Sequence, residues 1–299
     1  MLFAFFAPSS SSRTDFIEGR TEDPRRVNRL PPQSLLIDLD GVLFHGDQAL
    51  PGAWDLLRRL EGCPHCFLTN NPIRTPEAVA DALADMGLPR PDPRHILTSA
   101  LATARWLAHV KPGFRYFAVG AAGLDAALSA VGEPDDRRAD VVVVGEGPGL
   151  DYETLTTGIN LILERGARLV ATNPDTTVDG TRVGRHLVLP GGGALVTPFA
   201  AATGVTPTII GKPEPLLYEM ALEQLGCPAG RCLMIGDRPD TDIAGAERLG
   251  MWTALVRTGR FAPGAAWNLD MPKPDFDVTG LPALIEVLDR AFPGLLALR

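Results

Sequence analysis

Asp38 and Asp40 stand one residue apart where an apolar run, residues 34–39, comes to its end, and Gly41 follows them. Side chains two residues apart point to the same side of an extended chain. Two carboxylates beside a buried strand are costly unless a cation or a proton lies between them. The pair therefore indicates a cation site or acid–base chemistry, although an isolated Asp-x-Asp is also common in turns and helix caps.

Two more acids, Asp237 and Asp242, follow a second apolar run at residues 232–235. An all-oxygen set of this kind suits Mg²⁺, which takes a few carboxylates and keeps waters for a phosphoryl oxygen. Lys212, one of three lysines in the chain, follows the run 208–210. An ammonium beside the acids would offset the repulsion between an acidic nucleophile and a phosphate. Alone, Lys212 would equally fit a surface lysine before a helix.

The elements that must position these residues alternate regularly between strand and helix patterns. Strands are expected at 34–39, 66–69, 116–119, 141–145, 168–171, 208–210, 232–235 and 253–256. Helices are expected at 52–60, where Trp54, Leu57 and Leu60 recur every three residues, and around Leu155, Ile159 and Ile162. Thr75-Pro76 predicts another helix start, which Gly87 would end. This alternation predicts an α/β protein with mostly parallel sheets.

Parallel strands carry their functional loops at their carboxyl ends. Polar residues follow four of the expected strands, at 38–40, 69–71, 211–212 and 236–237, so we expect one site assembled from distant segments. Residues 111–205 have their own strand–helix rhythm and no such polar end. The predicted fold is a Rossmann-like parallel-sheet core, residues 30–110 and 206–299, with an inserted α/β cap domain at 111–205.

Residues 1–29 are set apart as a natural loose tail or the scar of an expression fusion, because Ile17-Glu18-Gly19-Arg20 is a protease recognition sequence. The apolar segment at residues 1–7 lacks a preceding basic region, so no signal peptide is expected. No stretch has the roughly 18 apolar residues of a membrane helix. The net charge of −8 argues against nucleic-acid and anionic membrane partners. Four cysteines in a chain of this length favour a reducing compartment, here the cytoplasm.

Other motifs admit rival interpretations. Cys63-Pro64-His65-Cys66 resembles a thiol oxidoreductase motif, but it enters a strand where that chemistry needs a helix start, so a plain loop with buried Cys66 is expected. Cys63, Cys66, Cys227 and Cys232 could hold a structural zinc, although their spacing is loose. Gly191-Gly192-Gly193 lacks the Lys-Ser/Thr of a phosphate loop and is expected to be a flexible link that leads into a helix at 194–202. His45 and His186 are expected at the surface or in packing, with a supporting role in the site open for His45.

Taken together, the motifs resemble those of the haloacid dehalogenase-like superfamily. The four segments are Asp38-Leu39-Asp40-Gly41-Val42, Thr69-Asn70-Asn71, Gly211-Lys212-Pro213-Glu214-Pro215 and Gly236-Asp237-Arg238-Pro239-Asp240-Thr241-Asp242. Within it, the chain resembles the group of 4-nitrophenylphosphatases, pyridoxal phosphate phosphatases and phosphoglycolate phosphatases, class IIA. That likeness rests on Pro51-Gly52-Ala53, Arg74-Thr75-Pro76-Glu77, Thr98-Ser99-Ala100 and Ala171-Thr172-Asn173-Pro174-Asp175. Members carry a large α/β cap between the second and third motifs.

The resemblance implies phosphoryl transfer through an aspartyl-phosphate. Asp38 would attack phosphorus, and Asp40 would protonate the leaving alcohol and later deprotonate the hydrolytic water. Thr69 and the amide of Asn70 would hold phosphoryl oxygens, while Lys212 would neutralise Asp38 and the phosphate together.

The resemblance also implies a metal cofactor, Mg²⁺. It would be held by Asp38, the backbone carbonyl of Asp40 and Asp237, with Asp242 supporting its water shell. A homodimer through the cap is implied in the same way.

Substrate choice is expected from Asn71, Arg74, Asn173 and Asp175, although Asn173-Pro174-Asp175 also fits a simple turn. Relatives usually have an aspartate and a basic residue where this chain has Glu146-Gly147-Pro148-Gly149. The expected activity is Mg²⁺-dependent hydrolysis of a small phosphomonoester: a sugar or polyol phosphate, phosphoglycolate, pyridoxal phosphate or a nucleotide. Phosphotransfer to an acceptor alcohol and non-catalytic binding of a phosphometabolite are the alternatives.

Overall fold

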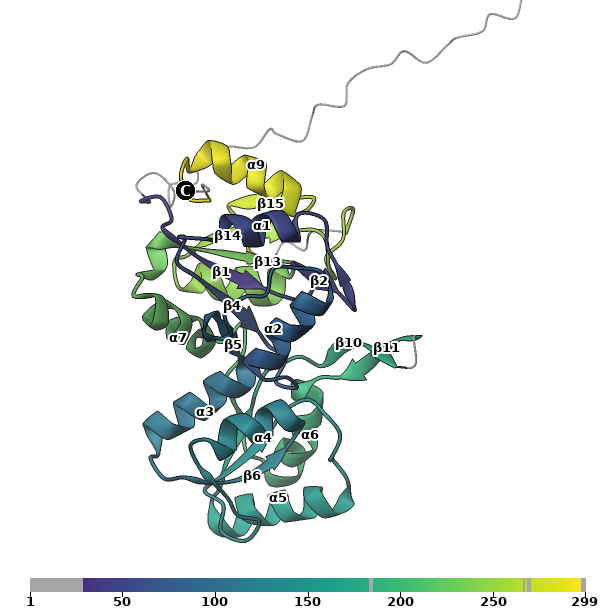
Figure 1. Cartoon of the computed structure of the whole chain (residues 1–299). Helices are drawn as coiled ribbons and strands as arrows, with labels where there is room; N and C mark the ends of the chain where they lie inside the picture. Colours follow the sequence, from purple (N-terminus) through teal and green to yellow (C-terminus); the bar gives the residue numbers. More distant parts are fainter. Residues whose placement is uncertain (1–28, 183–184, 266, 268–269, 297–299) are drawn as a thin grey trace, which may run out of the picture. The chain divides into compact units, whose positions relative to one another are not determined.

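The computed structural model describes residues 29–182, 185–265, 267 and 270–296 (Figure 1). The chain divides into two units, Met1–Leu30 and Pro31–Arg299. The expected tail, 1–29, lies outside the described residues except for Arg29. Everything that follows concerns the second unit.

A six-stranded parallel sheet carries most of the polar strand ends. Its order is β15 (Phe276–Val278), β14 (Trp252–Val256), β13 (Cys232–Gly236), β1 (Ser34–Asp38), β4 (His65–Thr69) and β5 (Ile96–Thr98). In the register, Ile37 pairs with Ile235 and with Phe67, so the carboxyl ends of β1, β13 and β4 lie side by side. This edge brings Asp38, Asp237 and Thr69 together, as the sequence predicted.

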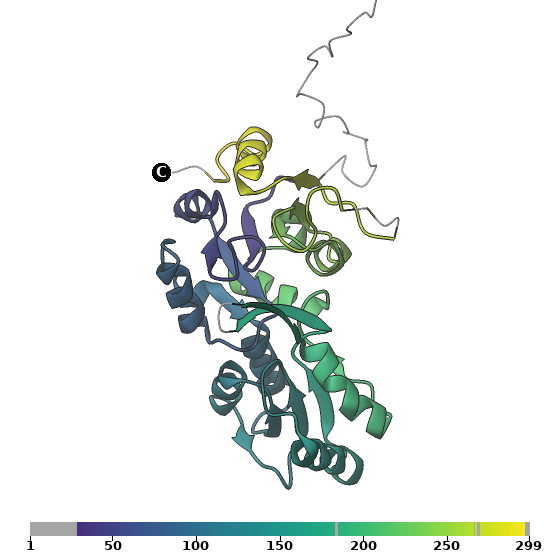
Figure 2. The same ribbon diagram turned by 90° about the vertical axis from the view of Figure 1, so that its right-hand side faces the viewer.

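Helices cover both faces of this sheet (Figures 1 and 2). On one face, α1 (Ala53–Arg59), α2 (Pro76–Asp85) and α9 (Leu281–Ala291) pack on an apolar cluster that includes Leu35, Ile37 and Phe67. On the other lie α3 (Ser99–Val110), α7 (Pro215–Leu225) and α8 (Ala244–Arg248). Alternate residues of β1 face opposite clusters, the pattern of a strand buried on both sides.

A second parallel sheet lies within the predicted insertion and has five strands. Its order is β12 (Thr208–Ile209), β9 (Arg168–Ala171), β8 (Val141–Val144), β6 (Arg115–Val119) and β7 (Glu133–Pro134). Helices α5 (Tyr152–Arg165) and α6 (Gly192–Thr203) cover one face, and α4 (Ala122–Ser129) packs with α3 on the other. One apolar cluster runs from Leu36 of the first sheet to Val141 of the second.

The membership of β12 differs from the expectation that residues 208–210 form a strand of the same sheet as Asp38. Thr208 pairs with Val170 and Ile209 with Ala171, both in β9. Lys212 therefore reaches the site from the second sheet, since only two residues separate it from the end of β12. The predicted bounds of the inserted domain, 111–205, stay a prediction.

The predicted apolar face of helix α1 is confirmed at Leu57 and Leu60, which pack on the core, and is wrong at Trp54. Ala53, Leu56 and Leu60 are buried, whereas Trp54 is 51% exposed, with the Arg58 guanidinium 5.5 Å from its ring centre. A strict three-residue spacing drifts around a helix of 3.6 residues per turn, so Trp54 falls outside the buried face.

Two antiparallel hairpins lie outside the two parallel sheets. The first, β2 (Phe44–His45) with β3 (Gln48–Ala49), follows Asp40. The second, β10 (Thr177–Arg182) with β11 (Arg185–Pro190), follows the Asn173-Pro174-Asp175 turn and was not predicted. None of the helices in the described part of the chain has the length and apolar content that crossing a membrane requires.

Candidate active site

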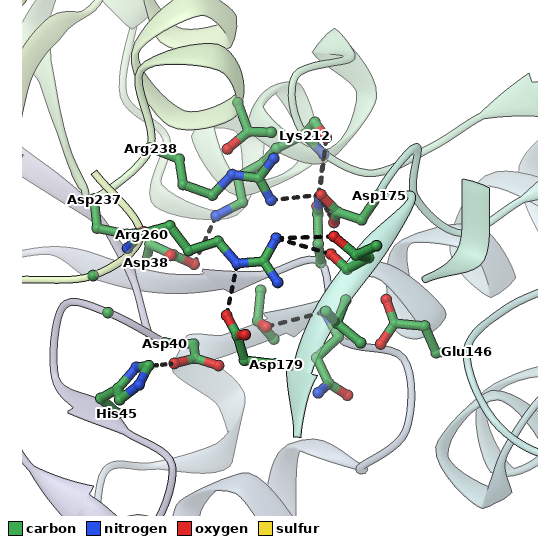
Figure 3. A pocket seen from close by; sticks show the side chains of 18 residues that line it. Asp38, Asp40, His45, Glu146, Asp175, Asp179, Lys212, Asp237, Arg238 and Arg260 are labelled. Carbon is green, nitrogen blue, oxygen red and sulfur yellow. Dashed lines mark hydrogen bonds and ion pairs between the residues drawn. The ribbon is translucent and has the colours of Figure 1, made fainter. Parts of the chain in front are cut away.

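A cavity at the carboxyl ends of the first sheet is lined by residues from both sheets and from the β10–β11 hairpin (Figure 3). Eight of the predicted site residues line it: Asp38, Asp40, Thr69, Asn70, Asn71, Asp175, Lys212 and Asp237. The other lining residues are Gly41, His45, Glu146, Thr177, Val178, Asp179, Arg238, Thr241, Gly259 and Arg260.

Lys212 bridges two buried carboxylates. Its Nζ donates to Asp38 Oδ1 at 2.6 Å and to Asp242 Oδ1 at 2.7 Å, and all three residues are buried. Burial raises the pKa of Asp38 to about 7, with Asp242 adding to the rise and Lys212 opposing it. The two carboxylates hold the pKa of Lys212 above its usual value despite burial. The ammonium therefore stays charged and favours the ionised form of Asp38.

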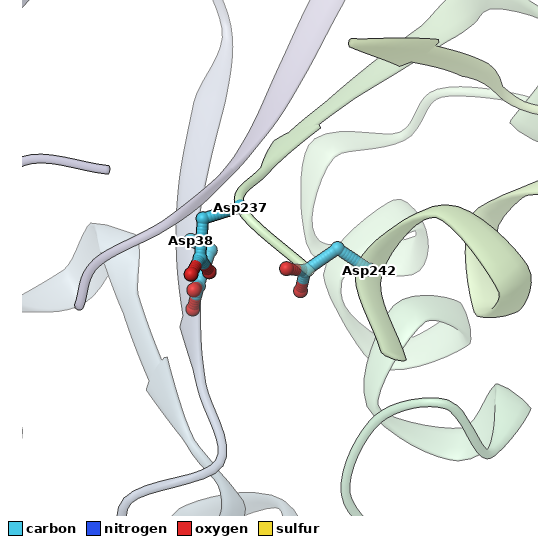
Figure 4. Close-up of side chains that lie close together, drawn as sticks. All are labelled: Asp38, Asp237 and Asp242. Carbon is cyan, nitrogen blue, oxygen red and sulfur yellow. The ribbon is translucent and has the colours of Figure 1, made fainter. Parts of the chain in front are cut away.

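Asp38, Asp237 and Asp242 each offer a carboxylate oxygen within 4.8 Å of the others (Figure 4). Burial, together with the charges of Asp242 and Asp38, raises the pKa of Asp237 well above its usual value. Three buried acids with a single lysine among them are under-compensated in charge. Their oxygen donors fit a hard divalent cation, which would supply the missing positive charge.

Glycines make room for Asp237. A Cβ on Gly41 would lie 2.5 Å from Asp237 Oδ2, and one on Gly259 would come closer still. Gly41 also has a φ of +79°, in the left-handed region that favours glycine. The backbone amide of Arg260 donates to Asp237 Oδ2 at 3.0 Å and so fixes the carboxylate against the turn.

Asn70 ties the Lys212 backbone to the first sheet. Its Oδ1 accepts from the Lys212 amide at 2.8 Å, and its Nδ2 donates to the Lys212 carbonyl at 3.0 Å. Nδ2 also donates to Asp175 Oδ2 at 2.8 Å. The Asn70 side chain thus fixes Lys212 and Asp175 in position relative to the carboxyl end of β4.

Asp40 lies at the rim of the cavity, outside the group of three buried acids. Its side chain is 56% exposed, and His45 Nδ1 lies 3.8 Å from its Oδ1. Desolvation of the carboxyl raises the pKa of Asp40, Asp179 adds to the rise, and His45 and Arg260 oppose it. A carboxyl with a raised pKa is suited to give and take a proton. The role left open for His45 now has a geometric basis, since His45 lines the cavity beside Asp40.

Comparison with known proteins agrees with this geometry. Residues 35–133 match the family model described as haloacid dehalogenase-like hydrolase, and residues 209–284 match a second model described as HAD-hydrolase-like. An acid sugar phosphatase of Staphylococcus aureus is 36% identical over 262 residues, which are 86% of this chain and 98% of the relative. The chain belongs to the haloacid dehalogenase-like hydrolases.

Solved structures similar to this chain support the same family. A p-nitrophenyl phosphatase from Archaeoglobus fulgidus has a TM-score of 0.78 at 30% identity, covering 87% of this chain and all of the other. A double mutant of the thermostable NPPase from Geobacillus stearothermophilus has a TM-score of 0.74 at 33% identity, covering 84% and 96%. The predicted class IIA membership and α/β fold with an inserted cap are confirmed, and this hydrolase is a phosphatase.

The remaining predicted substrate residues of the hydrolase lie in different surroundings. Thr69 Oγ1 accepts from the Asn71 amide at 3.1 Å, and Asn71 Oδ1 accepts from the Ile73 amide at 2.8 Å, so both shape the loop after β4. Arg74 is exposed and is not among the residues that line the cavity.

Asn173 is fully buried behind the cavity wall. Its Nδ2 donates to the Asn70 carbonyl at 2.8 Å and to Glu146 Oε1 at 2.9 Å, and its Oδ1 accepts from the Asp175 amide at 3.1 Å. Asn173 therefore positions three cavity residues.

Sequence reasoning missed two arginines that link the first sheet to the insertion. Arg238 donates to Asp175 Oδ1 at 2.6 Å, and Arg260 Nε donates to Asp179 Oδ2 at 2.6 Å. Arg260 follows β14, whose carboxyl end lies at the same sheet edge as Asp237, so the strand-end rule could have found it.

The rival motifs of the hydrolase have structural explanations. Cys63-Pro64-His65-Cys66 enters β4, and burial raises the pKa of the Cys63 thiol to about 11 and that of Cys66 to about 12, the opposite of a reactive thiolate. Among the described residues, the four cysteines are free, and the three aspartates form the metal-compatible cluster. Gly191 and Gly193 lie against the 174–175 backbone, where a Cβ would clash, so the glycine run serves close packing. The side chain of His186 lies outside the described part.

Proposed function

We propose that the protein hydrolyses small-molecule phosphomonoesters, with Mg²⁺, through an aspartyl-phosphate, an acyl phosphate formed on Asp38. The observation that carries this proposal is Asp38 in contact with Lys212 at the inner end of a cavity and beside Asp237 and Asp242. The names of the relatives, an acid sugar phosphatase and p-nitrophenyl phosphatases, point to phosphate monoesters as the substrate class.

In the first half of the proposed reaction, a carboxylate oxygen of Asp38 attacks phosphorus and the bond to the leaving alcohol oxygen breaks. Asp40 gives that oxygen its proton. Lys212 favours the ionised form of Asp38 and offsets its repulsion from the incoming phosphate. Thr69 and the backbone amide of Asn70, at the end of β4, would hold phosphoryl oxygens.

In the second half, a water molecule attacks the same phosphorus and passes its proton to Asp40. The bond between phosphorus and Asp38 breaks, which releases inorganic phosphate and restores both acids. The position of Asp40 at the rim, beside His45, suits a group that must meet first the alcohol and then water.

Asp38, the backbone carbonyl of Asp40 and Asp237 would hold Mg²⁺, with Asp242 supporting its waters. When bound, the ion supplies charge neutralisation of the phosphoryl oxygens. The cluster of buried carboxylates supports this, because one lysine offsets only part of their charge.

The alcohol portion of the substrate would contact residues of the insertion and of the loop after β4. Asn71 and Asp175 line the cavity, and we keep them as proposed substrate contacts. In this proposal Asn173 positions other residues, and Arg74 has no role in substrate binding. We extend the proposal to a homodimer formed through the insertion, which light scattering of the purified protein would test. A monomer at assay concentration would exclude it.

The decisive experiment measures phosphate release from a panel of sugar, polyol, nitrophenyl and pyridoxal phosphates, with and without Mg²⁺. The control is Asp38→Asn, which keeps the side chain's size but removes the nucleophile. Release that needs both Mg²⁺ and Asp38 supports the proposal. Release that survives in Asp38→Asn removes Asp38 as nucleophile, and a new phosphate ester formed with added glycerol would indicate phosphotransfer.

A further inference from the structure

Glu146 is a buried acid in the cavity wall that the proposed reaction does not use. It follows β8 in the second sheet and is only 2% exposed, yet it lines the same cavity as Asp38. Figure 3 shows its carboxylate turned toward the other side chains of the cavity.

One oxygen of this carboxylate has a partner and the other has none. Oε1 accepts from Asn173 Nδ2 at 2.9 Å. Oε2 is shielded from solvent, and no group among the described residues meets hydrogen-bonding geometry with it, although the Gly192 amide is near enough to the carboxylate to lower its pKa. A buried polar atom without a partner is costly and uncommon, so a donor is expected from outside the protein.

The charges around Glu146 restrict what that donor can be. The insertion's side of the cavity carries three acids, Glu146, Asp175 and Asp179. The two arginines nearby are engaged with acids: Arg238 with Asp175 and Asp240, and Arg260 with Asp179. The arginines offset the charges of Asp175 and Asp179, whereas no ion pair involves Glu146 among the described residues. Glu146 therefore offers an acceptor to a neutral hydroxyl and, when ionised, disfavours a second anionic group on the substrate.

We propose that Glu146 is a specificity-determining residue whose Oε2 accepts a hydrogen bond from a hydroxyl of the leaving alcohol. The substrate class is then a polyhydroxylated phosphate ester, a sugar or polyol phosphate, in preference to one that bears a carboxylate. This inference rests on the proposed function and adds to it the selection of the alcohol portion.

Glu146→Gln tests the oxygen that has no partner. Its amide oxygen keeps the bond from Asn173, while the charge and one acceptor are lost. Glu146→Leu removes both oxygens. Measured at pH 8, where Glu146 is ionised, the ratio of kcat/KM for glucose 6-phosphate to that for phosphoglycolate should fall about tenfold in Glu146→Gln and further in Glu146→Leu, since a hydrogen bond to a charged group is of that order.

Both variants are measured beside wild type and Glu153→Gln, an exposed acid on α5, with thermal unfolding as the check on folding. A purely structural role, or a bound water as the only partner of Oε2, lowers both rates alike, and an unchanged ratio overturns the inference. Absence of Asp38-dependent release from every ester in the wild-type protein instead overturns the proposed function.

Discussion

Arg260 Nε lies 2.6 Å from Asp179 Oδ2 and joins the loop after β14 to the β10–β11 hairpin of the insertion. Arg260 Nη1 also donates to the Thr177 carbonyl at 3.0 Å. All three residues line the cavity, so one wall of the site is an ion pair between segments 81 residues apart. The backbone of the same arginine supports Asp237, which links this wall to the acid cluster.

Breaking this ion pair should weaken substrate binding more than chemistry. We expect Arg260→Gln and Asp179→Asn each to raise KM about three- to tenfold, with kcat changed less, because a partly exposed pair contributes modestly. The double variant should resemble either single one, as a double-mutant cycle of steady-state kinetics will measure. Additive effects would mean that the two side chains act independently.

Removing the buried ammonium should affect both folding and activity. Lys212→Met leaves Asp38 and Asp242 without their shared partner, and we expect a loss of about 3–5 kcal/mol in the free energy of unfolding. Urea denaturation measures it. Lys111→Met is the matched control, because the Lys111–Asp140 pair is at the surface and should cost less than about 1 kcal/mol. Equal effects in the two variants would contradict the role given to Lys212.

A bound divalent ion should stabilise the fold independently of any substrate. At a Mg²⁺ concentration a hundredfold above its Kd, we expect Tm to rise by about 5 °C, and EDTA to reverse the rise. Asp237→Asn should lose most of this response, whereas the exposed Asp136→Asn should keep it. If differential scanning calorimetry finds the same Mg²⁺ response in both variants, the ion binds elsewhere.

The ionisation of Glu146 should make stability fall as the solution becomes alkaline. Burial raises the pKa of Glu146 from its ordinary 4.5 to about 7, against the hydrogen bond from Asn173. A raised folded-state pKa gives stability that is complete below pH 4.5 and is lost as pH rises through 7. At about 1.4 kcal/mol per pH unit, the loss is about 3 kcal/mol.

Glu146→Gln cannot ionise and should escape that loss. Its Tm relative to wild type should therefore be higher at pH 8 than at pH 5, whereas Glu153→Gln should show no such difference. An equal offset at the two pH values would show that Glu146 keeps its ordinary acidity in the fold.

The cluster of acids around Lys212 could be predicted from sequence because most of its residues lie at the carboxyl ends of parallel strands. Asp38, Thr69 and Asp237 follow strands of one parallel sheet, and such ends meet at one edge. Lys212 was predicted to join them and does, but from a strand of the other sheet. A two-residue strand, Thr208–Ile209, gives no sequence sign of which neighbour it pairs with.

The cavity wall was harder to predict because its residues act through partners. Asn173 was expected to contact substrate, which stays a prediction, and in the structure it is buried and bonds to Asn70, Glu146 and Asp175. A sequence gives the capacity of an asparagine to donate and accept, but which groups it meets depends on packing between two sheets. The Arg260–Asp179 pair was missed for the same reason.

The position of Lys212 after β12 limits how far the insertion can be treated as an exchangeable module. Because β12 pairs with β9, excising residues 111–205 would delete β9 and leave β12, which leads to Lys212, without its partner strand. A chimera that takes its insertion from a relative must therefore also take the segment through Lys212 and match it to Asn70. An exchange of the cap that leaves this segment out would remove the Lys212 contact to Asp38 and with it the activity whose specificity was to be changed.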